Sequence, residues 1–595
     1  MTPDRFATSA RIGQWSLARL AMTTLAGLIG VALTTTVAMA QAGGTAQRLV
    51  EGPTATLDDP RVGLAAGPKN FAEVAASNMR LISYTTKPAD LDFAQGLTFI
   101  NSDLAFAGDI VYQGNFSGFM VWDVSDPVHP KYLSTVVCAT DQGDPSIWGN
   151  LLFVSAESQR SRSDCGTQGV EDGADRTRGV RIFDVTNPAV PRLVKNVQTC
   201  RGSHTHTIVP DPTDPGVIYI YVGGTSGVRD AQELAGCSSG PVAENPNTSQ
   251  FRIDIIRVPL ADPEASEVVG FARIFEGLQP VGSRGGPSGC HDMTAYPAMN
   301  LVAGSCGSYG ILLDVSAPER PVRLDAISDA NFSLWHTAVF SNDGTKVVFT
   351  DEWGGGTAPR CRATDPIAMG GNTILSIENG RFTQHAYFKM PAAQTATENC
   401  VSHNGGLIPV PGRDLMVQGW YQGGVNVFDF TDPDNPVEIA YYDRGPISDD
   451  ELVVGGSWGA YWHNGYVYSS ELSRGFDIFE LTPSEFLSEN ELEAARLVTF
   501  EDYNPQSQPR LVWPAAFPVV RSYLDQLVRG EGLAPERTAA IAAELDAAEA
   551  AGGTTRAQQL TRIAAGLDSD AATARDSSRV REMAQAVRDL AAASR

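Results

Sequence analysis

The chain has 595 residues, of which 19% are charged and 43% hydrophobic, and its formal net charge is −25. This length allows one large architecture or several ordinary domains. An acidic surface repels phosphate backbones, so we expect no nucleic-acid partner.

Residues 1–40 are predicted to be a secretory signal peptide. Three arginines precede a mostly apolar run, and Ala38-Met39-Ala40 matches the small-x-small pattern of a cleavage site. An uncleaved N-terminal membrane anchor is the alternative; no later stretch is long and apolar enough to span a bilayer. We therefore expect an exported protein (periplasmic, secreted or at the cell surface) with no transmembrane span in the mature chain. Residues 41–78 are expected to be a linker.

One sequence phrase recurs between residues 79 and 505 and predicts the fold. It consists of a glycine, an alternating apolar strand, an acidic or small residue, often an Asp-Pro or Asn-Pro turn, and a second strand. Copies begin at residues 118, 179, 251, 310, 372, 424 and 475. Two further strand-like segments precede each copy. Four strands per unit, repeated seven times, predict an all-β protein, a seven-bladed β-propeller.

The last repeat lacks an outer strand, because GFDIFEL at 475–481 is followed by SEFLSENELEAA, which has the pattern of a helix. A strand-like segment, MRLISYTTKP at 79–88, stands before the first unit and resembles the outer strands of the other repeats. We expect this N-terminal strand to close the propeller, so that no sheet edge stays open. After residue 510 the chain is Ala-rich with 3-4-3 apolar spacing, which predicts a C-terminal α-helical bundle over 510–595.

Four consecutive inner strands are predicted to begin with histidines at nearly the same repeat position. The segments SHTHT, CHD, WHT and SHN contribute His204, His206, His291, His336 and His403. Because inner strands line the channel of a propeller, these imidazoles are expected to converge at the channel mouth. Imidazole is the commonest protein ligand of transition metals, so we predict a Cu, Zn or Fe ion there. Separate structural histidines, each hydrogen-bonded in the channel, are the alternative.

Carboxylates occupy a matching position at the predicted ends of the second strands. They are Glu352 in TDEW, Glu157 and Glu471. Beside metal-bound imidazoles, Glu352 would be a further ligand, an orienting partner of a ring N–H, or a catalytic general base. A solvated acid at the channel rim is the alternative, and it is favoured for Glu157 and Glu471.

Other polar residues of these segments are expected to be structural. Asp292 and Asn404 follow channel histidines directly and are expected to point to the opposite side of the strand, where they would cap loops. His129, His385 and His463 lie at other repeat positions, so we expect structural or exposed roles for them.

Eight cysteines in a chain predicted to be exported indicate disulfides. Each lies in a loop on the side predicted to carry the histidines, and Cys290 and Cys306 flank one hairpin, which makes a bridge between them easy. Proximity in the sequence suggests the remaining pairs: Cys138–Cys165, Cys200–Cys237 and Cys361–Cys400. Closing such loops contributes about 3–4 kcal/mol each in the chain-entropy model. Redox catalysis by the thiols is the alternative.

The phrase V-x-D-V-S-D-P-x-x-P resembles the LVIVD repeat family of exported bacterial and archaeal proteins, over about residues 79–482. This resemblance implies a β-propeller and is nearly silent about function. SHTHT, TDEW and GWYQGGVNVFDFTDPDNP are also similar to stretches of the selenium-binding protein/methanethiol oxidase family, a propeller family with histidine-rich inner positions and a metal taken to be copper. The paired-cysteine motif of that family is not evident here. The second resemblance implies that such a channel can hold a redox metal.

Two functions are compatible with these features. The first is an exported metal-binding propeller, an oxidoreductase or hydrolase, with a small molecule or protein bound at the top face that carries the histidines. The second is a non-enzymatic periplasmic or cell-surface interaction scaffold whose channel histidines are structural. Propellers host many unrelated functions, so the fold does not decide between them.

Overall fold

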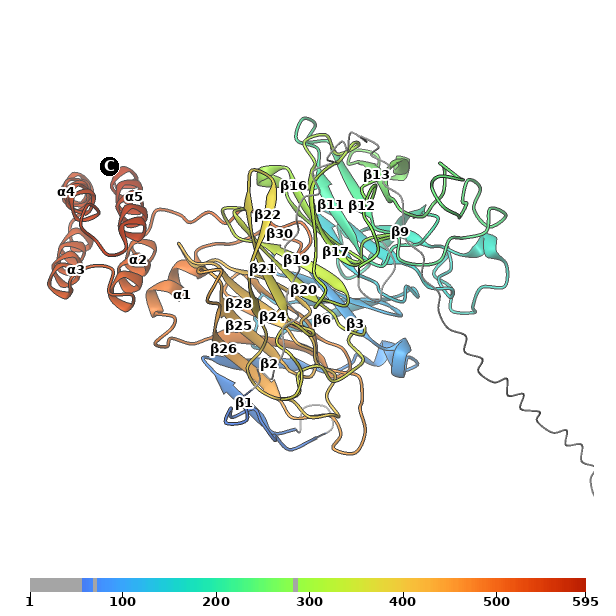
Figure 1. The fold of residues 1–595 in the computed structure, drawn as a ribbon, viewed down its shortest axis with the longest axis horizontal. Helices are drawn as coiled ribbons and strands as arrows, with labels where there is room; N and C mark the ends of the chain where they lie inside the picture. Colours follow the sequence, from blue (N-terminus) through green and yellow to red (C-terminus); the bar gives the residue numbers. More distant parts are fainter. Residues whose placement is uncertain (1–55, 68–71, 282–286, 595) are drawn as a thin grey trace, which may run out of the picture. The chain divides into compact units, whose positions relative to one another are not determined.

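The structure is a computed structural model, and it describes residues 56–67, 72–281 and 287–594. The predicted signal peptide, residues 1–40, lies outside the described residues. Strands follow one another from β1 (Val74–Ser77) to β29 (Gly475–Leu481), and helices dominate the C-terminal part (Figure 1). The predicted all-β architecture with a C-terminal helical region is therefore confirmed.

The strands form antiparallel groups of four that succeed one another along the chain. The first two groups are β3 (Asn101–Ala107), β4 (Ile110–Asn115), β5 (Gly118–Asp123), β6 (Lys131–Val137); and β7 (Pro145–Trp148), β8 (Leu151–Ala156), β9 (Gly179–Asp184), β10 (Arg192–Gln198). The next two are β11 (His206–Pro210), β12 (Val217–Val222), β13 (Ile253–Pro259), β14 (Glu267–Ala272); and β15 (Met293–Tyr296), β16 (Leu301–Cys306), β17 (Tyr309–Asp314), β18 (Val322–Ser328).

The later groups follow the same order. They are β19 (Trp335–Phe340), β20 (Lys346–Asp351), β21 (Asn372–Glu378), β22 (Arg381–Phe388); β23 (Asn404–Ile408), β24 (Leu415–Gly419), β25 (Val425–Asp429), β26 (Val437–Arg444); and β27 (Ser457–His463), β28 (Tyr466–Glu471) and β29 with β2 (Met79–Thr85). A short parallel pairing of β23 with β27 joins the last two groups into one sheet. The apolar core lies between neighbouring groups: Tyr221 and Ile255 of the third share a cluster with Val302 and Ile311 of the fourth.

The N-terminal strand completes the last group as predicted, since β2 pairs antiparallel with β29. The glycines that open the first and the last repeat explain how this strand fits. A Cβ on Gly118 would lie 1.9 Å from the carbonyl oxygen of Val136 on the outer strand, and one on Gly475 would lie 1.8 Å from that of Thr85. Both glycines have positive φ, 148° and 144°. β2 therefore approaches the backbone of β29 as closely as β6 approaches β5, and only a glycine at that position permits this.

The D-V-S/T part of the repeat turns the chain after the third strand. Asp123, Asp184, Asp314 and Asp429 each accept a hydrogen bond of 2.8–3.0 Å from the backbone N–H two residues later. The hydroxyl of Thr186 adds a bond of 2.7 Å to Asp184, and these hydrogen bonds lower the pKa of Asp184 to about 2. This side-chain turn gives the repeat signature a local structural role.

Part of the expected linker 41–78 is ordered against the sixth group. β1 pairs antiparallel with β26. Upstream, the buried Arg61 forms ion pairs of 2.7 Å with both Asp59 and Glu438. The segment before β2 therefore adds an edge strand and a buried ion pair to the strand region.

Residues 502–511 cross the C-terminal ends of several inner strands, the ends opposite the histidines. β30 (Asp502–Tyr503) pairs with β3. The side-chain amide of Asn504 bonds both backbone groups of Ile147 in β7, at 2.7 and 2.8 Å. Gln508 does the same to Phe340 in β19, at 3.0 and 2.9 Å. This crossing segment was not predicted from the sequence.

The helices are α1 (Glu489–Arg496), α2 (Phe517–Arg529), α3 (Pro535–Ala550), α4 (Gly553–Asp570) and α5 (Ser577–Ala593). The helix predicted from SEFLSENELEAA is α1, and a capping box of Ser488 and Glu491 starts it. Helices α2 to α5 lie together in one bundle (Figure 1) and share one apolar cluster of side chains. Glu491 links them to the strands, because it pairs with Arg413 at 3.0 Å and with Arg529 at 2.7 Å. Among the residues that the structure describes, none of the helices has the length and apolar character needed to cross a bilayer.

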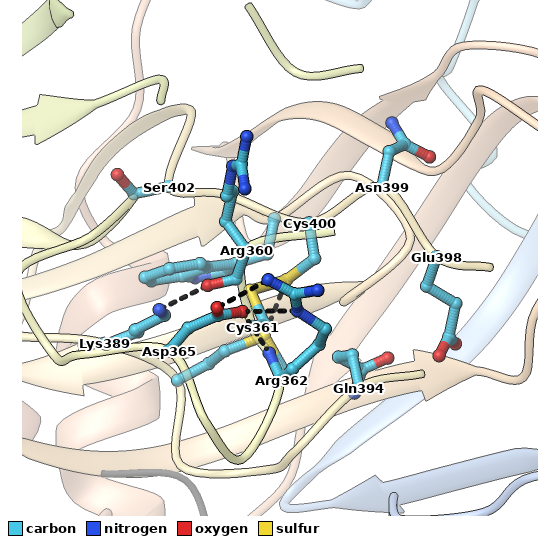
Figure 2. The surroundings of a disulfide bond; sticks show 12 residues. Arg360, Cys361, Arg362, Asp365, Lys389, Gln394, Glu398, Asn399, Cys400 and Ser402 are labelled. Carbon is cyan, nitrogen blue, oxygen red and sulfur yellow. Dashed lines mark hydrogen bonds and ion pairs between the residues drawn. A yellow bond between two sulfur atoms is a disulfide. The ribbon is translucent and has the colours of Figure 1, made fainter. Parts of the chain in front are cut away.

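All four predicted disulfides are confirmed: Cys138–Cys165, Cys200–Cys237, Cys290–Cys306 and Cys361–Cys400. Figure 2 shows the last of these, beside the ion pair of Arg362 and Asp365 at 2.8 Å. The Lys389 ammonium also donates to the carbonyl of Arg360 there. Cys400 lies three residues before His403, so this bridge anchors the segment that carries a predicted ligand.

Candidate metal centre

Three predicted histidines meet at the starts of three successive inner strands. His291 precedes β15, His336 is the second residue of β19, and His403 precedes β23. The ring centroids of His291 and His336 lie 4.1 Å apart, and so do those of His336 and His403. The expected convergence of imidazoles is therefore observed for these three residues.

Glu352 follows β20 and places its carboxylate beside two of the rings. Its Oε2 lies 3.6 Å from Nε2 of His336, and its Oε1 lies 3.7 Å from Nε2 of His403. The Tyr421 hydroxyl donates a hydrogen bond of 2.6 Å to the same Oε1. Glu352 is 6% exposed, so it is not a solvated rim acid. The ligand atoms of His336, Glu352 and His403 all lie within 4.8 Å of one another, so this group could hold a metal ion.

His291, Asp292 and His336 form a second possible ligand group, which shares His336 with the first. Asp292 Oδ1 lies 2.9 Å from Nδ1 of His291, and the ligand atoms of these three residues again lie within 4.8 Å. The other oxygen of Asp292 is buried without a hydrogen-bond partner among the described residues. The expectation that Asp292 points away from the histidines is wrong. It precedes the first residue of β15, so the alternation of side chains along a strand does not apply to it.

His403 is held in one tautomer. Its Nδ1–H donates to the carbonyl oxygen of Trp458, which leaves the lone pair on Nε2. That buried Nε2 has no hydrogen-bond partner in the described part of the chain. It faces the Glu352 carboxylate, so two acceptors lie 3.7 Å apart. A shared proton or a cation would satisfy both, and a metal ion therefore fits this site.

Burial favours the neutral imidazoles that metals require. It lowers the pKa of His336 well below its ordinary value, and the three neighbouring histidines lower it further. Burial also lowers the pKa of His403, although the Glu352 carboxylate acts in the opposite direction. Neutral imidazole is the form that ligates metals, so neither ring must lose a proton on binding.

His204 continues the row of rings, but its nitrogens are occupied. Its ring centroid lies 4.3 Å from that of His291. Its Nδ1 lies 2.5 Å from Glu157 Oε1, and its Nε2 lies 3.0 Å from Gln142. Burial disfavours charge on His204, but the Glu157 carboxylate outweighs it and raises the pKa of His204. His204 therefore forms an ion pair beside the centre, with no free nitrogen for a metal.

The structure places His206 apart from this row, which corrects the predicted ligand set. Its Nδ1 lies 2.8 Å from the Ser155 hydroxyl of β8, and its ring packs near Phe153. It belongs to β11 itself, whereas His204 precedes that strand. Two positions further along the chain, the side chain of His206 therefore packs against strand β8 of the preceding group and does not join the row of rings.

Glu157 and Glu471 are not solvated rim acids either. Burial would raise the pKa of Glu157, but His204 and two hydroxyl donors lower it to about 2. Glu471 is buried and accepts backbone hydrogen bonds of 2.8 Å from Gly456 and 2.9 Å from Ser473. It caps its own loop and contributes no ligand to the centre.

Two aromatic residues at the centre were missed as site residues. The ring centroids of Tyr421 and Trp458 lie 4.6 and 4.7 Å from that of His403. Burial raises the pKa of Tyr421 well above its ordinary value, and Glu352 raises it further, so the phenol remains a hydrogen-bond donor. In the sequence, Trp458 of SWGAYW stands at the repeat position where other inner strands have histidine, but no signal connected Tyr421 with Glu352.

The remaining histidines lie elsewhere, as expected. His129 is exposed and pairs with an aspartate at 3.0 Å. His385 lies in the outer strand β22 and contacts Asp434 at 2.9 Å. His463 ends β27 and lies 2.7 Å from the carbonyl oxygen of Gly108. The amide of Asn404 donates to an aspartate of β3 at 2.8 Å and so turns away from the histidines.

No protein-family model and no curated protein matches this chain. Solved structures with distant similarity include the Cps50 (Swd1) β-propeller domain of Myceliophteria thermophila, with 8% identity and a TM-score of 0.40 over 68% of this chain and 100% of that chain. The Dos1 propeller has 12% identity and a TM-score of 0.37, covering 65% and 80%. A functionally unknown protein from Desulfotomaculum acetoxidans DSM 771 has 11% identity and a TM-score of 0.36, covering 57% and 84%. Such distant similarities do not bear on function.

Proposed function

We propose that this protein is an exported, seven-bladed β-propeller that binds one transition metal ion at its histidine end. His336, His403 and Glu352 would be the central ligands, and His291 with Asp292 would complete the site. One observation carries the proposal. The unpartnered Nε2 of the neutral His403 faces the Glu352 carboxylate at 3.7 Å, and two buried acceptors in this arrangement favour a cation between them.

The count of seven blades is supported by the seven antiparallel groups of four strands and by the contribution of β2 to the last one. A ring closed by strands from both ends of the chain leaves no open edge. The repeat glycines and side-chain turns also support the resemblance to the LVIVD repeat family. In this arrangement the inner strands line a channel, and the crossing segment 502–511 would cover the end opposite the histidines.

Export is supported by the four disulfides, which indicate an oxidising environment, and by the signal-like residues 1–40. All cysteines of the described chain are paired, which removes thiol redox chemistry as an alternative there. The location would be the periplasm, the cell surface or the medium.

A mixed set of imidazole and carboxylate ligands suits Cu, Zn or Fe. When bound, such an ion would supply either redox chemistry or Lewis-acid activation of water. The chain itself contributes three things. His403 is fixed by the Trp458 carbonyl, Glu352 is oriented by Tyr421, and the aromatic rings limit access of water. The reaction would be that of an oxidoreductase or a hydrolase, with substrate reaching the centre from the histidine end.

The test is the metal content, by mass spectrometry, of protein exported to an oxidising compartment. We expect about one metal ion per chain in the wild type, and loss of the ion in a folded His336→Ala/His403→Ala variant. His385→Ala is the matched control, because His385 lies in an outer strand, and it should retain the metal. A wild type that stays metal-free after incubation with Cu, Zn and Fe would contradict the proposal and favour the interaction scaffold.

A further inference from the structure

A cavity of about 530 Å³ opens at the histidine end, between the first and last strand groups. Phe99 and Ile100 precede β3, Val454 precedes β27, and Leu472 follows β28. These positions are the starts of inner strands and the end of a second strand, the positions that carry the histidines and Glu352 in other groups. The volume is within the range of small-molecule sites, roughly 300–1,000 Å³.

The apolar wall of this cavity continues to the candidate metal centre. Ile100, Val454 and Leu472 belong to one apolar cluster with Tyr421 and Trp458. Trp458 and Tyr421 in turn contact the ring of His403. A molecule in the cavity would therefore lie against the side chains that pack on His403.

The polar side of the cavity is cationic in an acidic protein. The Lys87 ammonium donates to the Ala94 carbonyl at 2.9 Å and lies 4.8 Å from the centroid of the Phe99 ring. It forms no ion pair with a carboxylate in the described part of the chain. Arg474 also lines the cavity, although Glu471, 3.8 Å away, offsets its charge. Among the described residues, Lys87 is thus a cation without a counter-ion on an apolar wall, in a chain of net charge −25.

We propose that this cavity binds a small organic anion with an apolar body, an aromatic or aliphatic carboxylate. The carboxylate would pair with Lys87, and the body would pack on Phe99, Ile100 and Leu472. Such a ligand would gain free energy in two ways: its apolar body is removed from water, and its carboxylate forms a charged hydrogen bond with the Lys87 ammonium. The role of this anion as substrate rests on the proposed metal function, whereas its binding does not.

The test uses the fluorescence of 8-anilinonaphthalene-1-sulfonate, an anionic aromatic probe, titrated into the full mature chain. Phenylacetate should displace it at concentrations at which 2-phenylethanol, the neutral analogue, does not. Lys87→Gln should weaken probe binding about tenfold, as expected for a lost charged hydrogen bond. Val454→Trp should also weaken binding, because the indole would take up part of the cavity beside the apolar wall.

A matched control excludes binding at the helices, where a larger cavity of about 720 Å³ is lined by residues including Arg562. Arg562→Gln should leave the titration unchanged. Circular dichroism and metal content are recorded for every variant. Probe binding that survives both Lys87→Gln and Val454→Trp, or stronger displacement by 2-phenylethanol, overturns the proposal. Because the titration is run with and without metal, loss of the metal hypothesis and loss of this one are distinguishable: metal-free protein should still bind the probe.

Discussion

His403 and His463 lie at opposite ends of two inner strands, β23 and β27, that pair in parallel. Both rings are buried, and each has one nitrogen on a backbone carbonyl, of Trp458 and of Gly108 respectively. Each also has a second nitrogen without a hydrogen-bond partner among the described residues. An unpartnered imidazole nitrogen is therefore not enough to identify a metal site.

The neighbours make the difference. His403 faces a carboxylate at 3.7 Å and a second imidazole ring at 4.1 Å. His463 instead stacks on Phe106, with centroids 4.5 Å apart, and has Tyr468, Phe500 and Tyr503 around it. A neutral imidazole packs favourably against aromatic rings, so the environment of His463 requires no metal ion. The convergence of a second and third ligand, rather than burial, distinguishes the histidine end.

The largest expected effect comes from removing each ring. His403→Ala should lower metal affinity by more than about a hundredfold. Losing a residue that only hydrogen-bonds to a ligand costs up to about a hundredfold, and losing the ligand itself should cost more. His463→Ala should keep the metal and lose about 2–3 kcal/mol in the free energy of unfolding, because it leaves a cavity. Competition with a chromophoric chelator and urea unfolding give the two quantities. Equal metal loss in both variants would remove the distinction between the two ends.

The disulfides at the histidine end allow stability and metal affinity to be separated. Replacing Cys290 and Cys306 by Ser opens a loop of 16 residues and should cost about 3 kcal/mol of unfolding free energy. Replacing Cys200 and Cys237 opens one of 37 residues and should cost about 4 kcal/mol.

Metal affinity should fall more when the Cys290–Cys306 bridge is replaced than when Cys200–Cys237 is replaced, because Cys290 is the residue directly before His291. Urea unfolding of the metal-free variants, compared with chelator competition on the same samples, measures both quantities. If metal affinity simply followed stability in the two variants, the bridge beside His291 would have no local role in the centre.

The end of the inner strands opposite the histidines should show its own pH dependence. Burial lowers the pKa of His463 to about 4, below the ordinary 6.5 of an exposed imidazole. Between these values the unfolded chain binds a proton that the folded chain does not, so stability decreases as the pH falls from 6.5 toward 4. Between pH 7.5 and 5 this contributes about 2 kcal/mol. Urea unfolding of metal-free His463→Gln should lack that part of the acid destabilisation; an unchanged pH slope would contradict the assignment.

The features predicted from the sequence are those that repeat in register. The glycine at the start of the third strand and the aspartate at its end recur in several groups, because these groups share the same close approach and the same turn, as Gly118 and Asp123 show. His336, His403 and Glu352 could be predicted to converge because their repeat positions coincide.

The features that were missed depend on contacts outside the repeat. Asp292 lies just before its strand, where side-chain alternation gives no direction. Tyr421 reaches Glu352 from the neighbouring group, a contact that no periodicity encodes. The crossing segment 502–511 binds inner strands through side-chain amides such as that of Asn504, so it has no apolar pattern to read. His204 and His206 fit the repeat position equally well, and only the start of β11 separates them.

The smallest expected effect tests how Glu352 is oriented. Tyr421→Phe removes the hydroxyl that donates to Glu352 and keeps the ring that packs on His403. Metal affinity should fall about tenfold, the lower range for a residue that orients a ligand. Tyr461→Phe is the matched control, because its buried hydroxyl donates to Asp103 and not to Glu352. Chelator competition on both variants decides between two roles of Tyr421. A tenfold loss only in Tyr421→Phe means that the hydroxyl positions a metal-bound carboxylate. Equal affinities mean that Glu352 keeps its orientation without the phenol, and the aromatic rings around His403 then serve only to exclude water.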